Sequence, residues 1–498
     1  MKHVILALSA LVVCGAVHAQ RPLADLIQNG DRAAALAAID DGADVNSSQG
    51  DGTTPLHWAV YKVDRELVAE LLDRGAEADV VNKYGSSPLA EAVKLGDLAL
   101  VRQLLDAGAN VESPNADGQT TLMLAARVGS LDVAKLLVER GADVNATEAW
   151  RDQTALMWAV DGNFPELTQF LIDQGADVNA RASANDWDSQ ITAEPRAQYR
   201  PVGGLTVLVY AARSGCTRCV RSLLAAGADV DKPTPEGMTP LMIAIDNQAY
   251  DTARLLLDEG ANPHVWDWYG RTALYIAVDM SNFRGRLSHP TSSSETSAND
   301  LVRLLLEAGV NPNAQLNMHR PSRGGNMGRF ADELLTTGTT PLLRAAIASD
   351  VDTVRLLLAH GALVDLPNVH GLTPLMAVSG MASGRQFNAE LGQERAIELL
   401  DVLLAAGADV NAKISDANPL TARIGRQPSS VTDREGQTAL FGAARLGWAN
   451  VVDYLLAKGA DPNVKDKRGL TPVDAAMGRT GGRETRTSPE IAARLRAR

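Results

Sequence analysis

The sequence predicts an all-α repeat solenoid, a stack of about twelve helix-turn-helix units with β-hairpin fingers between them. Two signatures carry this prediction. A helix-opening tetrad, written Thr-Pro-Leu-His in its fullest form from Thr54 to His57, recurs along the chain, and so does a Gly-Ala-Asp-Val-Asn ending. Uninterrupted copies lie 33 or 34 residues apart. Variants of the tetrad start at Ser87, Thr120, Thr154, Thr206, Thr239, Thr272, Thr340, Thr373, Thr438 and Thr471. Two short helices cannot bury their apolar faces alone, so the copies must stack.

The stretch from Gly118 to Asn145 shows how one unit is built. Thr120 is placed to cap its first helix and Gly129 to end it, and Ser130 is placed to cap the second helix. Gly141 follows the second helix, where a left-handed C-terminal cap is needed and only glycine has no steric cost. The second helix presents apolar side chains at i, i+3 and i+4, namely Val133, Leu136 and Leu137.

The period and both signatures resemble the ankyrin repeat, over nearly all of residues 21 to 498. The resemblance implies a stack of helix pairs with β-hairpin fingers, used mainly to bind other proteins. It also implies that His57 is structural, because the histidine of the family's tetrad forms hydrogen bonds within the repeat. It does not name the partner.

The expected organisation has a signal peptide at 1–19, an N-terminal capping repeat at 20–46, a repeat array at 47–469 and a C-terminal capping repeat at 470–498. Insertions interrupt the array at 181–204, 281–300, 316–337, 381–395 and 414–430. The first, third and fifth follow a repeat ending, which is the finger position, whereas the other two fall between the helices of one repeat. Insertions gathered on one face often mark a binding face, but loops also vary in length because this is tolerated. Both readings stay open.

The first residues read as a secretory signal. Lys2 and His3 precede an apolar run that ends at Ala16, too short to span a membrane, and small residues favour cleavage after Ala19. Cys14 raises the alternative of a lipoprotein, but Val13 is larger than the residue usually found there. The protein is therefore expected to be exported, either periplasmic or secreted.

Two Asn-X-Ser/Thr sequences bear on the compartment. Asn46 and Asn145 match the glycosylation pattern, yet both fall in the structural ending of a repeat, where a glycan would obstruct stacking. This favours a bacterial periplasm over a eukaryotic secretory route.

Composition narrows the function classes. The net charge is -13, which makes nucleic acid a poor ligand because phosphate contacts supply most of that affinity. The histidines lie in different repeats or loops without metal-ligand spacing, and the longest insertion is too short for a catalytic domain. We therefore expect no enzyme activity, no cofactor, no metal and no membrane insertion, in a chain that is monomeric.

Cys216 and Cys219 form a CxxC motif at the start of a second helix. That placement stabilises thiolates in redox proteins, and the spacing also allows a disulfide. However, Cys219 aligns with the core residue Val133, and no thioredoxin-like βαβ pattern surrounds the motif. A periplasmic redox or redox-protecting factor using this pair is the alternative to a binding scaffold.

The aromatic residues indicate where a partner would sit. Positions after the tetrad are expected to face the concave groove, namely Trp58, Glu91, Leu124, Trp158, Tyr210, Ile243, Ile276 and Arg344. Positions just before a tetrad are expected at the fingertips, namely Tyr84, Trp150, Trp266, Trp268 and Tyr269. Exposed aromatic side chains anchor protein interfaces. The predicted partner-binding residues are Trp58, Trp150, Trp158, Tyr210, Trp266, Trp268 and Tyr269, and Trp58 and Trp158 could equally pack beneath their own fingers. A glycan or small molecule stacked on Trp150, Trp266 and Trp268 is a further alternative.

Overall fold

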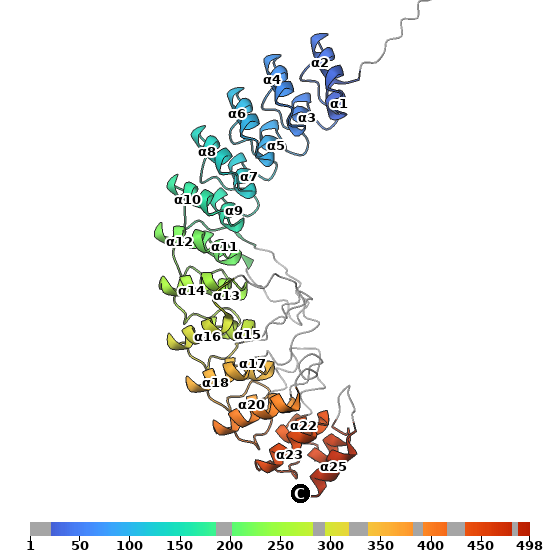
Figure 1. The fold of residues 1–498 in the computed structure, drawn as a ribbon, viewed down its shortest axis with the longest axis vertical. Helices are drawn as coiled ribbons and strands as arrows, with labels where there is room; N and C mark the ends of the chain where they lie inside the picture. Colours follow the sequence, from blue (N-terminus) through green and yellow to red (C-terminus); the bar gives the residue numbers. More distant parts are fainter. Residues whose placement is uncertain are drawn as a thin grey trace, which may run out of the picture. The chain divides into compact units, whose positions relative to one another are not determined.

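The computed structural model describes residues 21–185, 202–281, 294–317, 337–381, 392–415, 434–480 and 487–498. Within them the chain is a succession of short helix pairs (Figure 1). It divides into two compact units, Met1–Ala149 and Trp150–Arg498. The predicted signal peptide and much of each predicted insertion lie outside the described residues.

Unit 1 consists of helix pairs in which the first helix opens with the tetrad and the second precedes the glycine ending. The pairs are α1 (Leu23–Gln28) with α2 (Arg32–Asp40), α3 (Pro55–Tyr61) with α4 (Arg65–Asp73), α5 (Pro88–Leu95) with α6 (Leu98–Asp106), and α7 (Thr121–Val128) with α8 (Leu131–Glu139). The first pair has no tetrad, and Asp31 caps its second helix by accepting a hydrogen bond from Ala34 N.

Unit 2 repeats the same plan. Its pairs are α9 (Ala155–Asp161) with α10 (Pro165–Asp173), α11 (Val207–Ser214) with α12 (Thr217–Ala225), α13 (Pro240–Asp246) with α14 (Tyr250–Asp258), α15 (Ala273–Ser281) with α16 (Ala298–Glu307), α17 (Pro341–Ala348) with α18 (Val351–Ala359), α19 (Pro374–Met376) continued by the π-helical turn η1 (Ala377–Met381) with α20 (Gln393–Ala405), α22 (Ala439–Leu446) with α23 (Ala449–Ala457), and α24 (Pro472–Ala476) with α25 (Pro489–Arg496). In the described residues, no helix is long and apolar enough to cross a membrane.

The tetrad works as a helix start. Thr120 Oγ1 accepts a hydrogen bond from Met123 N at 3.3 Å, as the sequence predicts, and Gly129 ends α7 in the left-handed conformation. In the second helix, Val133 and Leu137 are fully buried, so the apolar spacing does form the core. The prediction for Ser130 is only partly right, because it occupies the N-cap position of α8 without a capping hydrogen bond from its side chain.

The asparagine of the repeat ending ties one repeat to the next. Asn46 Nδ2 donates to the carbonyl of Gly75 at 3.0 Å, and its Oδ1 accepts from Glu77 N at 2.8 Å. The same pair of bonds recurs from Asn179 to Gly227 and Asp229, from Asn313 to Gly361 and Leu363, and from Asn411 to Gly459 and Asp461. A glycan on Asn46 Nδ2 would remove one of these bonds. We refer to these residues as the junction asparagines.

The insertions at the finger position start and end in paired backbone. Ala182 N donates to Leu205 O at 3.0 Å, Leu316 N to Thr339 O at 3.1 Å, and Ile414 N to Gln437 O at 2.9 Å. These are also the junctions that Asn179, Asn313 and Asn411 bridge. The repeats on either side of each insertion are therefore joined by bonds that lie outside it.

The fingers differ from the β-hairpins that we expected. In the described part of the chain, strand pairing is limited to β1 (Ala184–Asn185) with β2 (Val202–Gly203) and to isolated bridges at Arg181–Thr206 and Trp266–Thr272. Most fingers are instead tight turns closed by a side chain. Asn82 Oδ1, for example, accepts from the backbone of Tyr84 and Ser86, both at 3.0 Å. Asn82 N also donates to Ser86 O at 3.0 Å, so an Asx turn and one backbone bond close the finger without an extended strand pair.

Candidate functional site

Neighbouring fingers are held in register by one backbone hydrogen bond each. In unit 1, Lys83 N donates to Asp51 O at 2.8 Å, and Ala149 N donates to Asp117 O at 2.8 Å. In unit 2, Trp268 N donates to Glu236 O at 2.8 Å. Because these bonds fix the backbone of the tips, each tip side chain projects from a defined point even where it is exposed.

Three of the predicted tryptophans are exposed at fingertips. Trp266 is 64% exposed and Trp268 is 42% exposed, on the same finger, and Trp150 is exposed on another. The Arg151 guanidinium lies 5.4 Å from the centre of the Trp150 ring. The finger that carries Trp266 and Trp268 is closed by Asp267, whose Oδ1 accepts from two backbone amides of the turn. We refer to it as the tryptophan finger.

The exposure predicted for Tyr210 is wrong, since only 5% of it is accessible. Gln153 Nε2 donates to its hydroxyl at 2.6 Å, and the Arg213 guanidinium lies 4.9 Å from its ring centre. Burial raises the pKa of Tyr210. The side chain thus packs against a finger residue of the repeat before it.

The exposure predicted for Tyr269 is wrong as well, since only 7% of it is accessible. The Arg271 guanidinium lies 5.6 Å from its ring centre, and its carbonyl accepts a hydrogen bond from Asn317 N at 2.9 Å. Arg271 is itself buried, and its charge is paired with Asp267 at 2.7 Å. Tyr269 therefore supports the tryptophan finger from within.

Two of the predicted groove tryptophans are half-buried. Trp58 Nε1 donates to Gln49 Oε1 of its own finger at 2.9 Å, so part of this side chain packs beneath the finger. Its ring meets the exposed Tyr61 edge to face, with centroids 5.7 Å apart. Trp158 is likewise intermediate in exposure. The sequence analysis missed Tyr61, although its place one helical turn after Trp58 puts both on the same face.

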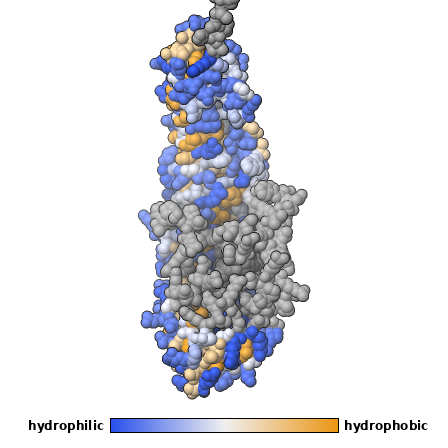
Figure 2. All heavy atoms as spheres, turned by 90° about the vertical axis from the view of Figure 1, so that its right-hand side faces the viewer, coloured by the Kyte–Doolittle hydropathy of each residue, from blue (hydrophilic) through white to orange (hydrophobic). Residues whose placement is uncertain are grey.

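Several other expected groove positions are buried. Leu124, Ile276 and Arg344 all have little accessible surface. The Arg344 guanidinium is held by Asp279, with Nε 2.7 Å from Oδ1. Buried arginines are usually paired in this way, so the ion pair accounts for its position. The surface offered to a partner is narrower than the sequence indicated. Figure 2, which faces the side of the first helices, shows separate apolar patches among hydrophilic surface.

Cys216 and Cys219 form a disulfide, with their Cα atoms 5.2 Å apart. Cys216 is the N-cap residue of α12, and its sulfur accepts a hydrogen bond from Cys219 N at 3.2 Å. Both sulfur-bearing side chains are buried, and Thr168 Oγ1 lies 3.5 Å from Cys219 Sγ. A buried disulfide in a helix cap braces the helix, and this position does not favour redox exchange with a substrate.

His57 is buried in the helix start of α3, as the resemblance implies. Its Nδ1 accepts from Thr54 N at 3.2 Å, so Nε2 carries the proton and donates to Ser86 O at 3.0 Å. Burial lowers the pKa of His57. Both ring nitrogens are occupied by structural bonds. Among the described residues, no group of three or more metal-ligating side chains comes together.

Comparison with known proteins places this repeat among described families. The sequence pattern described as ankyrin repeats (3 copies) matches residues 23–115, 89–182, 189–267 and 208–315, and the pattern of the single ankyrin repeat matches 337–369 and 435–467. The ankyrin repeat and KH domain-containing protein mask-1 of Caenorhabditis elegans is 31% identical over 161 residues, which are 29% of this chain and 6% of that protein.

Two further similarities come from a bacterium and from a solved structure. A putative ankyrin repeat-containing protein of Treponema pallidum is 35% identical over 117 residues, which are 23% of this chain and 34% of that protein. The structure of the human ASB11 ankyrin repeat domain is 21% identical, with a TM-score of 0.39, and covers 49% of this chain and 99% of that one. The chain thus spans about a third or less of the length of these two curated relatives.

Proposed function

Because the chain belongs to the ankyrin-repeat family, we propose that it is a non-catalytic scaffold that binds another protein through its fingertips and first-helix face. Ankyrin repeats are generally protein-interaction modules, and their fold is typically non-catalytic. The observation that carries the proposal is the tryptophan finger. It presents two exposed tryptophan side chains on a backbone that is hydrogen-bonded to the finger before it.

The physical basis is the burial of aromatic surface on a preorganised support. Interfaces concentrate their binding energy in a few large side chains, with tryptophan prominent among them. A side chain on a fixed finger loses little conformational freedom on binding, so more of the contact energy appears as affinity. An exposed apolar patch is itself a sign of an interaction site. The half-buried Trp58 and its exposed neighbour Tyr61 form a second, smaller aromatic contact area within unit 1.

Affinity capture from an extract, followed by identification of what co-purifies, supplies the partner. The double variant Trp266→Ala, Trp268→Ala is then expected to weaken binding by at least about 2 kcal/mol while melting stays unchanged. Tyr84→Ala serves as the matched control, because it removes an exposed fingertip aromatic from unit 1. Full affinity in the tryptophan variant, or an equal loss in the control, would refute this assignment of the binding surface. Binding retained only by carbohydrates on a glycan array would favour the glycan alternative instead.

We also propose that the protein is exported and loses residues 1–19. Two features support this. One is the apolar segment that follows Lys2, and the other is the disulfide between Cys216 and Cys219, since disulfides persist mainly in oxidising compartments. N-terminal sequencing of the protein from its source is expected to begin at Gln20. An intact Met1 on protein from the cytosol would overturn the proposal.

A further inference from the structure

A second surface lies in unit 1, at the turns that join the first and second helices of successive repeats. Val63, Leu95 and Val128 sit in three consecutive turns, 32 and 33 residues apart, and all three are exposed. We call this row the turn edge. Leu95 and Val128 share one repeat position, and Val63 lies at the position that follows it. Single exposed aliphatic side chains need no explanation, but exposed aliphatic side chains in three successive turns form an organised apolar surface.

Val63 has a strained backbone. Its φ is 59°, in the left-handed region, where the next two turns have Gly96 and Gly129 at φ 67° and 75°. A β-branched residue is unfavourable there, and strain of this kind persists where it serves a purpose. The adjacent repeats have glycine at this position, and Asn163, Gln248 and Ser349 also occupy it with positive φ, but these three side chains are not β-branched. The valine side chain, 44% exposed, is therefore kept at a cost to stability.

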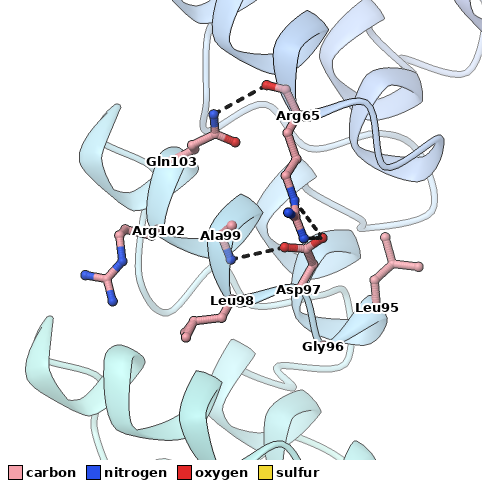
Figure 3. Close-up of a pocket in the computed structure, with 8 residues that line it drawn as sticks. All are labelled: Arg65, Leu95, Gly96, Asp97, Leu98, Ala99, Arg102 and Gln103. Carbon is pink, nitrogen blue, oxygen red and sulfur yellow. Dashed lines mark hydrogen bonds and ion pairs between the residues drawn. The ribbon is translucent and has the colours of Figure 1, made fainter.

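The turn edge is hollowed beside these side chains. One hollow of about 750 Å³ is lined by Arg65, Leu95, Gly96, Asp97, Leu98, Ala99, Arg102 and Gln103 (Figure 3). A second, of about 480 Å³, is lined by Lys62, Val63, Asp64, Arg65 and Glu66. Arg65 takes part in both. Both hollows are thus lined by aliphatic as well as charged side chains.

The charges on this edge are unevenly partnered. Asp64 and Glu66 accept from Arg32 at 2.7 and 2.6 Å, and Asp97 accepts from Arg65 at 2.8 Å. Each acid around the hollows therefore has an arginine partner, although Asp64 and Glu66 share one. In contrast, the exposed cations Lys62 and Arg102 have no ion pair within the described part of the chain. In a protein of net charge -13, this edge offers two free cations beside apolar side chains.

From this arrangement we propose that the turn edge of unit 1 binds an acidic protein segment that also carries aliphatic side chains. Its carboxylates would pair with Arg102 and Lys62, where charge-assisted hydrogen bonds are stronger than neutral ones. Its aliphatic side chains would cover Leu95 and Val63. A basic segment would meet the two cations that lack an ion pair, whereas the carboxylates of the hollows already have arginine partners, so charge favours the acidic segment. This surface is separate from the tryptophan finger, and the two proposals can fail independently.

The test uses the full-length mature protein and fluorescent synthetic peptides. One peptide alternates glutamate with leucine, a second replaces each glutamate by lysine, and a third replaces each leucine by serine. Fluorescence anisotropy is expected to show salt-sensitive binding of the first peptide only. The double variant Lys62→Ala, Arg102→Ala is expected to weaken that binding about tenfold or more. The tryptophan-finger variant is expected to leave it unchanged.

Val63→Gly separates a binding role from a structural one. Glycine relieves the strain at this φ, so the variant is expected to melt at a higher temperature and yet bind the glutamate-leucine peptide more weakly. Equal binding of the lysine peptide, or unchanged binding by both the cation and the Val63 variants, would overturn the proposal. Binding to phosphatidylglycerol vesicles without binding to the peptide would also overturn it and would assign the edge to a membrane surface.

Discussion

Asp365 stands where other repeat junctions have an asparagine. Its Oδ2 accepts a hydrogen bond from Asp409 N at 2.8 Å, which matches the acceptor role of the junction asparagines. Its Oδ1 is buried without a hydrogen-bond partner. At Asn411, the corresponding side-chain amide donates to the glycine carbonyl two residues before the bonded amide. By the same geometry, Asp365→Asn would place a donor against the carbonyl of Gly407.

The expected effect is a gain in stability of about 1–2 kcal/mol at neutral pH. One new hydrogen bond accounts for about 0.5–1.5 kcal/mol, and removal of a partly buried charge for the rest. Burial raises the pKa of Asp365, with a smaller contribution from the carboxylate of Asp409. A raised pKa in the folded state means that stability is greater below the unfolded pKa and is lost as pH rises through the folded pKa. The gain from asparagine should therefore shrink in acid.

Urea denaturation at neutral pH and near the carboxyl pKa of about 4 measures this difference. Hydrogen exchange at the amide of Asp409 is expected to slow in the variant, because the junction closes with two bonds instead of one. Asp117→Asn is the control, since it removes the same charge from an exposed fingertip side chain. A neutral or destabilising effect at neutral pH, or an equal gain in the control, would refute the reasoning.

The other predictions concern a histidine, the core and the disulfide. Burial lowers the pKa of His57, so the unfolded chain binds the proton more readily than the folded chain. The free energy of unfolding should therefore fall as pH decreases from about 6.5 through the folded pKa. NMR titration of His57 together with thermal melting over the same pH range checks this, and an unshifted pKa would contradict it. Leu137→Ala should cost about 2–5 kcal/mol, whereas Trp268→Ala should stay within about 0.5 kcal/mol, and comparable losses on melting would mean that the tryptophan is structural. The double variant Cys216→Ser, Cys219→Val should fold and bind the captured partner, and loss of binding with unchanged melting would favour the redox alternative.

The fold could be predicted from the sequence because the repeat period marks each helix pair. The helix predicted to start after Thr120 and to end at Gly129 forms at Thr121–Val128, because the cap and the glycine lie within one short segment and act locally. The predicted β-hairpins do not form strand pairs in most fingers of the described residues, since a finger such as that of Asn82 is closed by its side chain and one backbone bond. Closure of a turn by an asparagine side chain follows from local turn chemistry, which the resemblance to the family did not predict.

The candidate site could be predicted only in part, because the repeat period does not determine which side chains stay exposed. A period assigns a residue to a helix face or a fingertip, and Trp266 was correctly placed at an exposed tip. Whether such a residue stays exposed depends on contacts from other segments. Tyr210 is covered through Gln153, which lies 57 residues earlier in the chain, and Arg344 through Asp279, 65 residues earlier. No pattern within one repeat contains that information.

The junction asparagines bear on how this protein can change over time. Asn179, Asn313 and Asn411 hold adjacent repeats together at the junctions where an insertion interrupts the repeat sequence. The paired backbone at Leu316 and Thr339 fixes both ends of one such insertion. Residues added between these ends raise the entropic cost of loop closure only slightly, because that cost grows slowly with loop length. The sequence between these ends can therefore change in length and composition while the bonds that join the repeats stay the same, and a protein engineer has the same freedom.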